Sequence, residues 1–412
     1  GALESFSFLH MGYKGLIEQR GGASLPLMTP FFETEGERAS LQSLTWGRKS
    51  DWIPTFCGTA GSLAVEGMLL APVGERGFLY QLTVRSTSDK PLSSTFGLEG
   101  CWASAWHCVN EDKEIDGARR CYTSLWNDSL IFDMRCGLPL FAFAPMMDQP
   151  CSSTFQETDA GIVYRLAHNC TLEPGQAVTV TFYWGVGFEE VAAATSAKEM
   201  LRQGWQHELQ VTTDWLDARR WPIPDAQLER LYNTNLFFCL FYSAGITLDT
   251  EELVLVTSRS PRYYVSAAYW DRDSLLWSFP TVVDADPALA RRMLDYVFGR
   301  QRRNLGVHSR YIDGTVLEPG FELDELMAPV LALERYAAAT GDRDCLEDNA
   351  IRSGLTDILP VSAEAHRILM LKCFGIQSST ELMKLFAHLG VFGAMYFSCR
   401  KQIVRIHRAR RL

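Results

Sequence analysis

The stretch FLYQLTVRSTSDKPLSSTFGLEG (residues 78–100) contains two extended segments separated by a turn. In residues 78–86 apolar and polar side chains alternate, which is the period of a strand with one buried face. Ser, Asp and Pro in residues 88–91 favour a turn, and residues 92–100 resume an extended pattern. The stretch therefore predicts strand, turn and strand.

The same pattern recurs in the rest of the first half of the chain. Residues 161–167 are extended, residues 172–175 (LEPG) predict a turn, and residues 177–184 are rich in Val and Thr. Short strands separated at this spacing by Gly, Pro and Asp are typical of an antiparallel β-sandwich. Residues 1–190 are therefore predicted to form a β-sandwich domain.

The pattern becomes helical near Glu189. Good helix formers follow, so residues 191–224 are predicted to be a linker helix that ends at the Pro-rich segment 221–224. Asp225 is placed to cap the next helix. The fold class expected for the whole chain is multi-domain α and β.

Helix signals continue through residues 225–362, the predicted helical domain. Asp286 followed by proline is a strong helix start. Residues 322–340 carry apolar side chains at helical spacing, and Gly341 is placed to end that helix. Pro329 inside the pattern predicts a kink or a later start.

Composition limits the classes of function. The chain has 412 residues, 47% hydrophobic residues and a net charge of −10, which fits a globular protein and gives no support to a nucleic-acid partner. Eleven cysteines without a Cys-x-x-Cys pair indicate free thiols in a reducing compartment, so cytoplasmic localisation is expected. The dispersed histidines predict no metal site, no cofactor motif is present, and no apolar run is long enough to predict a membrane partner.

The last residues differ in charge from the rest. Nine Lys/Arg and one acid lie between residues 365 and 412, whereas the preceding residues contain 30 basic and 48 acidic side chains. Residues 363–412 are therefore predicted to be an atypical basic tail, and a truncated or frame-shifted C-terminus would explain it.

Residues 270–274 (WDRDS) hold the densest charge pattern, with Arg272 between two carboxylates and with Tyr269 and Trp270 beside them. One interpretation is a structural Arg–Asp ion pair with Asp273 or Ser274 capping a helix. The other is a polar patch in an apolar cleft, where carboxylates and Arg bind sugar hydroxyls and aromatic rings cover the pyranose.

A second acidic cluster follows some fifty residues later, where a loop enters a helix. Carboxylates are favoured at helix N-termini, so simple charge placement is one interpretation. The other is a general acid: glycoside hydrolysis needs one protonated carboxyl group and, in inverting enzymes, a second carboxylate about 6.5–9.5 Å away. His308 could line the same cleft. In this segment Asp324 and Glu325 are the candidates for the general acid, and Asp313 and Glu322 are candidates for substrate binding.

The order of these motifs resembles the six-hairpin, or (α/α)6, glycosidases over roughly residues 177–353. The resemblance rests on the Arg-Asp-Ser step after aromatics, a helix hairpin, and FELDE (321–325) entering a helix. Glucoamylases and the glucosidase domain of glycogen-debranching enzymes are the nearest likenesses. The resemblance implies a β-sandwich ahead of a helical toroid, incomplete here, and inverting hydrolysis of terminal α-linked hexoses from an oligosaccharide or polysaccharide.

The resemblance also implies residue roles. Arg272 and Asp273 would hold hydroxyls of the terminal sugar. The general acid would be Glu325 by the glucoamylase pattern and Asp324 by the debranching pattern. The expected substrate-binding residues are Tyr269, Trp270, Asp271, Arg272, Asp273, Asp313 and Glu322.

The general base is the missing part of this pattern. The resemblance places it on a late helical hairpin, where residues 354–412 contain only Asp357, Glu364 and Glu381 as acids. A toroid of twelve helices also needs roughly 200 residues. The missing base and the basic tail keep open a carbohydrate-binding protein whose hydrolysis is impaired. An α-mannosidase or other hexosidase on the same scaffold also stays open, because no residue fixes the axial or equatorial hydroxyl of the sugar.

Overall fold

The computed structural model describes residues 1–125, 127–358, 360 and 361, and these form two compact units. Unit 1 comprises Gly1–Phe8, Ile17–Cys108 and Asp112–Thr234. Unit 2 comprises Leu9–Leu16, Val109–Glu111 and the described residues from Asn235 onward. The basic tail predicted at 363–412 lies outside the described residues.

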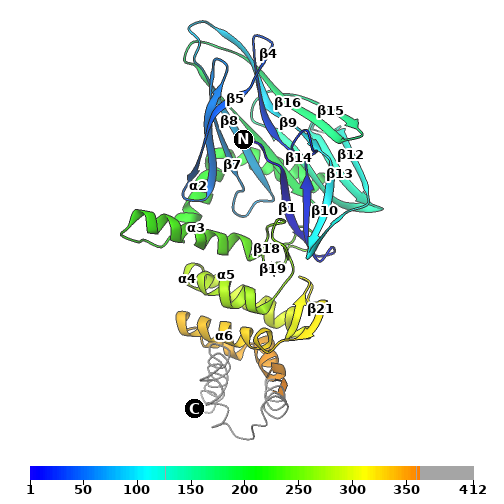
Figure 1. Cartoon of the computed structure of the whole chain (residues 1–412), viewed down its shortest axis with the longest axis vertical. Coiled ribbons are helices and arrows are strands. Elements are labelled where there is room, and N and C mark those ends of the chain that lie inside the picture. The colour runs from blue at the N-terminus through cyan, green and yellow to red at the C-terminus, as the bar shows by residue number, and fades with distance from the viewer. Residues whose placement is uncertain (126, 359, 362–412) are drawn as a thin grey trace. The chain divides into compact units, whose positions relative to one another are not determined.

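Unit 1 is dominated by antiparallel sheets (Figure 1). The largest has eight strands, in spatial order β12 (Ala118–Thr123), β13 (Leu130–Cys136), β14 (Leu138–Met147), β17 (Ala177–Gly187), β8 (Gly77–Ser86), β7 (Leu63–Leu70), β6 (Ile53–Ala60) and β5 (Leu41–Lys49). A five-stranded sheet has the order β15 (Ser152–Thr158), β16 (Gly161–Leu172), β9 (Leu92–Trp102), β3 (Thr29–Thr34) and β4 (Glu37–Ala39). A four-stranded sheet contains β1 (Ser5–His10), β2 (Gly15–Arg20), β10 (Ser104–Val109) and β11 (Glu111–Glu114).

Aromatic side chains join the two larger sheets. Trp102 on β9 lies 5.1 Å from Phe143 on β14 between ring centroids, and Tyr164 on β16 lies 5.6 Å from Trp184 on β17. All four side chains are essentially buried. Because large aromatic side chains contribute most to core burial, these contacts hold the two sheets together face to face.

The strands predicted at 78–86 and 92–100 are confirmed as β8 and β9. They lie in different sheets: β8 pairs with β7 and β17, whereas β9 pairs with β3 and β16. The turn between them therefore connects the two sheets, which local sequence pattern does not reveal.

The segment predicted as one linker helix forms two helices, α1 (Glu190–Gln203) and α2 (Trp205–Asp217). Gly204 between them has φ 86°, a conformation that favours glycine and ends α1. The buried side of α1 is a row of alanines that packs on β14 and β17. A Cβ at Gly185 would lie 2.1 Å from the Ala193 carbonyl oxygen, so glycine permits this close approach.

Unit 2 contains most of the remaining helices, and α3 (Ala226–Tyr242) crosses the boundary between the units. The elements that follow are β18 (Ala244–Ile246), β19 (Leu253–Leu255), the π-helical segment η1 (Asp273–Ser278), α4 (Phe279–Ala285), α5 (Pro287–Gly299), the 3₁₀ turn η2 (Gln301–Asn304), β20 (Val307–Arg310), β21 (Val316–Phe321), α6 (Leu323–Thr340) and the 3₁₀ turn η3 (Asp344–Glu347). Within the described residues, every helix is too short or too polar to cross a membrane.

The predicted helix ends are confirmed. Asp225 accepts hydrogen bonds from the backbone N–H groups of residues 227 and 228, and Asp286 caps α5. Gly341 ends α6 with φ 72°. The late start considered for α6 is wrong, because the helix begins at Leu323 and runs through Pro329.

The Asp286 cap provides a small test of the fold. Its Oδ1 accepts a hydrogen bond from Leu289 N–H at 3.0 Å. Asp286→Ala removes this bond, and we expect a loss of about 1 kcal/mol in the free energy of unfolding. Urea unfolding measures the change. Asp286→Ser keeps a capping oxygen and should retain most of the stability, and equal losses for both substitutions would contradict the capping role.

Candidate active site

Arg272 contacts four acidic side chains of unit 2. Its Nη1 lies 2.9 Å from Glu322 Oε2 and 2.9 Å from Asp324 Oδ2. Its Nη2 lies 3.5 Å from Glu325 Oε1, and its Nε lies 3.6 Å from Asp273 Oδ2. We call these five residues the Arg272 cluster. The structure thus joins WDRDS and FELDE, which are about fifty residues apart in the sequence.

Two helix starts position the cluster. Asp273 begins η1, and Glu322 immediately precedes α6, whose first turn carries Asp324 and Glu325. Helix α6 packs against η1, so both N-terminal ends supply charged groups to one place. The helix N-terminus favours these carboxylates, as the simpler interpretation states, and Arg272 balances part of their charge.

Glu325 differs from the other acids in the cluster because its side chain is fully buried. Burial, with a further contribution from the charge of Asp271, raises its pKa from 4.5 to about 8. The Arg272 N–H donates to Glu325 Oε2 at 3.1 Å and opposes this shift. Glu325 Oε1 has no hydrogen-bond partner within the described residues. Glu325 is therefore a mostly protonated carboxyl group at neutral pH, which is the state that a general acid requires.

Arg272 remains a cation in this setting. Burial alone would lower the pKa of its guanidinium, but the hydrogen bonds to Asp324 and Glu322 raise the pKa above its ordinary value. The Arg272 side chain is 31% exposed. It is thus a charged donor accessible to a ligand and already surrounded by carboxylates.

Asp271 has a different environment from its neighbour Asp273. It is fully buried, pairs with the equally buried Arg310, and accepts a hydrogen bond from the Tyr269 hydroxyl. Backbone hydrogen bonds between Tyr269 and Arg310 hold the two segments together. The structural ion-pair interpretation therefore describes Asp271. Asp271 and Tyr269 have no exposed surface in this arrangement, and their direct contact with a sugar stays a prediction.

Two exposed tyrosines near Asp273 were not singled out from the sequence. Tyr263 and Tyr264 are 40% and 76% exposed, with ring centroids 4.9 Å apart. Burial raises the pKa of Tyr263, and the nearby charges of Tyr264 and Asp273 add to the shift. Trp277, 69% exposed, lies four residues after Asp273 in η1. The doublet in SPRYYVS (260–266) was the available signal.

Of the remaining candidate residues, His308 and Trp270 lie at the cluster and Asp313 does not. His308 Nδ1 lies 2.9 Å from Glu322 Oε1, and the His308 ring packs edge-on to Trp270, which is largely buried. Asp313 instead belongs to a turn, where Thr315 and Lys14 hydrogen bonds lower its pKa although burial opposes them. The contacts recorded for Asp313 are thus separate from the Arg272 cluster.

Sequence reasoning gave Arg310 no role and no partner. It lies on β20, 39 positions from its partner Asp271, within the unremarkable segment VHSRY. A pairing at such a distance depends on the fold, and no local pattern indicates it.

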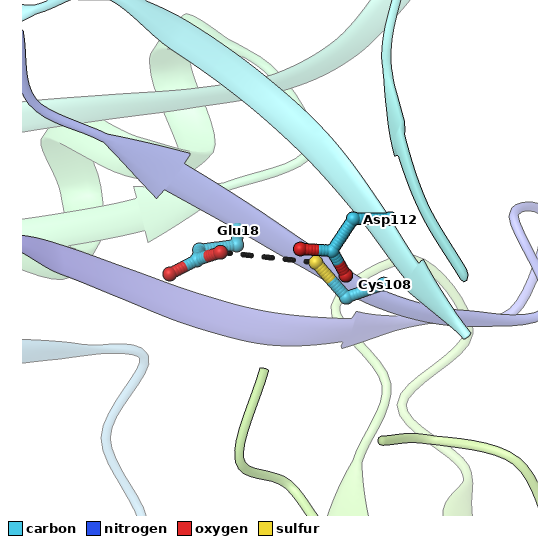
Figure 2. A group of neighbouring side chains, drawn as sticks. All are labelled: Glu18, Cys108 and Asp112. Carbon is cyan, nitrogen blue, oxygen red and sulfur yellow. Dashed lines mark hydrogen bonds between the residues drawn. The ribbon is translucent and has the colours of Figure 1, made fainter. Parts of the chain in front are cut away.

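One group of potential metal ligands occurs in the described part of the chain, in unit 1 (Figure 2). It consists of Glu18, Cys108 and Asp112. Arg20 already pairs with both carboxylates. Burial, with help from the Asp112 charge, raises the pKa of the Cys108 thiol far above its ordinary value. The two carboxylates are therefore part of an ion-pair network with Arg20.

The late acids expected to include a general base are largely outside the described residues. Glu364 and Glu381 lie there. Asp357 is described: it is exposed and pairs with Arg302 at 2.6 Å.

Comparisons with known proteins show similarity only at the level of structure. No protein-family model and no curated protein matches the chain. A putative kojibiose phosphorylase from the human microbiome has a TM-score of 0.54 and 10% identity, over 84% of this chain and 49% of that chain. A bacterial glucoamylase complexed with acarbose has a TM-score of 0.50 and 10% identity, over 98% of this chain and 66% of that chain. The chain thus spans about half the length of the first and 66% of the second. It shares the fold of these enzymes, which confirms the resemblance to glucoamylase-type proteins.

Proposed function

We propose that this protein is a glycoside hydrolase that removes terminal α-linked hexoses from oligosaccharides by inversion, with Glu325 as the general acid. The observation that carries the proposal is the buried, protonated carboxyl group of Glu325 in contact with Arg272. A carboxylic acid with a raised pKa beside a cationic donor matches the acid half of glycoside hydrolysis. The shared fold supports this assignment.

The cluster suggests how substrate and acid meet. Arg272 contacts Glu325 and is itself partly exposed. Hydroxyl groups of a terminal sugar would replace the hydrogen bonds of Arg272 and its ion pair with Asp273, and the movement of the guanidinium would open a path to Glu325. Glu325 then donates its proton to the glycosidic oxygen. Tyr263, Tyr264 and Trp277 offer exposed rings for the adjoining sugar.

The finer architecture belongs to the same proposal. Unit 1 would be the β-sandwich domain, and the helices of unit 2 would be part of an (α/α)6 toroid. The substrate would be neutral, and the protein would act in the cytoplasm, because the nine described cysteines are free thiols. In an inverting reaction a second carboxylate activates water from the opposite face of the sugar.

Substrate turnover tests the proposal. Maltose, isomaltose, kojibiose and α-mannobiose are incubated with the 412-residue chain, with and without inorganic phosphate, and the product anomer is followed by NMR. We expect phosphate-independent release of β-glucose from at least one glucoside. Release from mannobiose alone would indicate the hexosidase alternative, and phosphate-dependent formation of a sugar phosphate would replace hydrolysis by phosphorolysis. Tryptophan fluorescence changes without any turnover would leave a carbohydrate-binding protein.

A further inference from the structure

Unit 1 contains a hollow of about 440 Å³ on the side of β5–β8, bordered by the first turns of α2. Its volume is within the range of small-ligand sites, about 300–1,000 Å³. All of its lining residues belong to unit 1, whereas the Arg272 cluster belongs to unit 2. The hollow therefore shares no lining residue with the Arg272 cluster.

The floor of the hollow is a polar row across four strands. Thr45 on β5 pairs with Cys57 on β6, Cys57 with Glu66 on β7, and Glu66 with Thr83 on β8. Directly paired residues on adjacent strands project from the same face of a sheet, so these four side chains lie side by side. The row continues to β17, where Thr83 and Thr179 hydroxyls are hydrogen-bonded at 2.8 Å.

A second row lies two residues along each strand and consists of Gly47, Thr55, the apolar Met68 and Gln81. Gln81 Nε2 donates to Thr181 Oγ1 at 3.4 Å. Gly47 leaves space in this row, because a Cβ there would lie 3.1 Å from Thr55 Oγ1. The floor thus combines hydroxyl and amide groups that both donate and accept hydrogen bonds.

The wall of the hollow is apolar and fixed. It is formed by Trp205 and Leu209 of α2. The Trp205 backbone N–H donates to the Tyr183 hydroxyl at 3.0 Å, which anchors the start of α2 to β17. Trp205 therefore places an indole among the groups that line the hollow, beside the polar floor.

The lining groups select a class of ligand. Lys49 and Glu66 contribute one charge of each sign, so an anionic phosphate has no excess of cations to bind it. One carboxylate and one thiol are too few for a tetrahedral or octahedral metal site. A sugar ring matches both the floor and the wall of the hollow, because its hydroxyls bind the polar row and its C–H face stacks on the Trp205 indole.

We infer that this hollow is a non-catalytic binding site for a short segment of a neutral oligosaccharide, additional to the site at Arg272. It would retain a polymeric substrate on unit 1 while a chain end is processed elsewhere. The inference stands on the hollow alone and does not require the hydrolase assignment.

Cys57 makes the site directly testable, because it is exposed on the floor, and Cys136 is an exposed thiol elsewhere in unit 1. Alkylation of both thiols by iodoacetamide is followed by peptide mass spectrometry with and without maltoheptaose, cellohexaose or mannohexaose. We expect at least one oligosaccharide to slow alkylation of Cys57 about threefold or more at saturation, with Cys136 unchanged.

Variants locate the effect. Trp205→Ala and Thr83→Val should each abolish the protection of Cys57, whereas Glu157→Gln on the exposed strand β15 and Arg272→Ala should retain it. An alkylation rate of Cys57 that stays unchanged with all three sugars would overturn the inference. Protection that survives in both Trp205→Ala and Thr83→Val would overturn it too. Protection lost only in Arg272→Ala would also contradict the inference, because Arg272 does not line the hollow.

Discussion

Glu325→Gln is expected to lower the rate of maltose hydrolysis by about 10²–10⁴-fold, the usual contribution of a general acid. Glutamine has nearly the same shape and can still accept the hydrogen bond from Arg272 N–H, but it has no proton to donate to the glycosidic oxygen. The measurement is kcat on maltose and on α-glucosyl fluoride. Because fluoride leaves with little protonation, the variant should lose much less activity on the fluoride.

Asp324→Asn is the matched control, since Asp324 is the other candidate acid and lies next in the sequence. Its carboxylate is hydrogen-bonded to Arg272 Nη1 at 2.9 Å, so we expect a rise in KM with a smaller loss in kcat. If Asp324→Asn instead showed the leaving-group dependence and Glu325→Gln did not, the assignment of the acid would be reversed.

The raised pKa of Glu325 gives the reaction a pH dependence of known sign. The reactive form is protonated, so kcat/KM should fall as pH rises through about 8, and Glu325→Gln should lack this limb. The free energy of unfolding should also fall as pH rises. The folded protein retains a proton on Glu325 that the unfolded chain loses near pH 4.5, so stability falls between pH 4.5 and 8. Glu325→Gln should show a flatter unfolding profile over this range, which urea denaturation measures.

Local signals predicted the elements of this protein well, and long-range pairing accounts for what they did not predict. Alternation identified β8 and β9, and Asp286 identified the start of α5, because these features depend on neighbours within a few residues. The separation of β8 and β9 into different sheets depends on pairing with β7 and β16, which a short window cannot show.

The candidate site shows the same division. The sequence order of WDRDS and FELDE indicated that they belong together, and the structure joins them through Arg272. The different environments of Asp271 and Asp273, two residues apart, could not be predicted. Arg310, which is distant in sequence, determines that Asp271 is buried.

The buried pair of Asp271 and Arg310 is the basis of the second large effect. Asp271→Asn leaves the Arg310 guanidinium buried without its counter-ion, and breaking such a pair typically costs about 3–5 kcal/mol. The free energy of unfolding in urea measures this loss. The exposed pair Arg352–Glu347 is the control, and Glu347→Gln should cost less than about 1 kcal/mol. Arg310→Met combined with Asp271→Leu should be less destabilised than either single substitution, because no unpaired charge remains.

The same substitution connects stability to the chemistry. The negative charge of Asp271 helps to raise the pKa of Glu325, so removing that charge should move the alkaline limb of kcat/KM to lower pH. Asp271→Asn is therefore expected to destabilise the fold and to shift the pH profile together, whereas a pair with only a structural role would leave the profile of the remaining folded enzyme in place. A loss of stability with an unchanged alkaline limb would separate Asp271 from Glu325, and the raised pKa would then depend on burial of Glu325 alone.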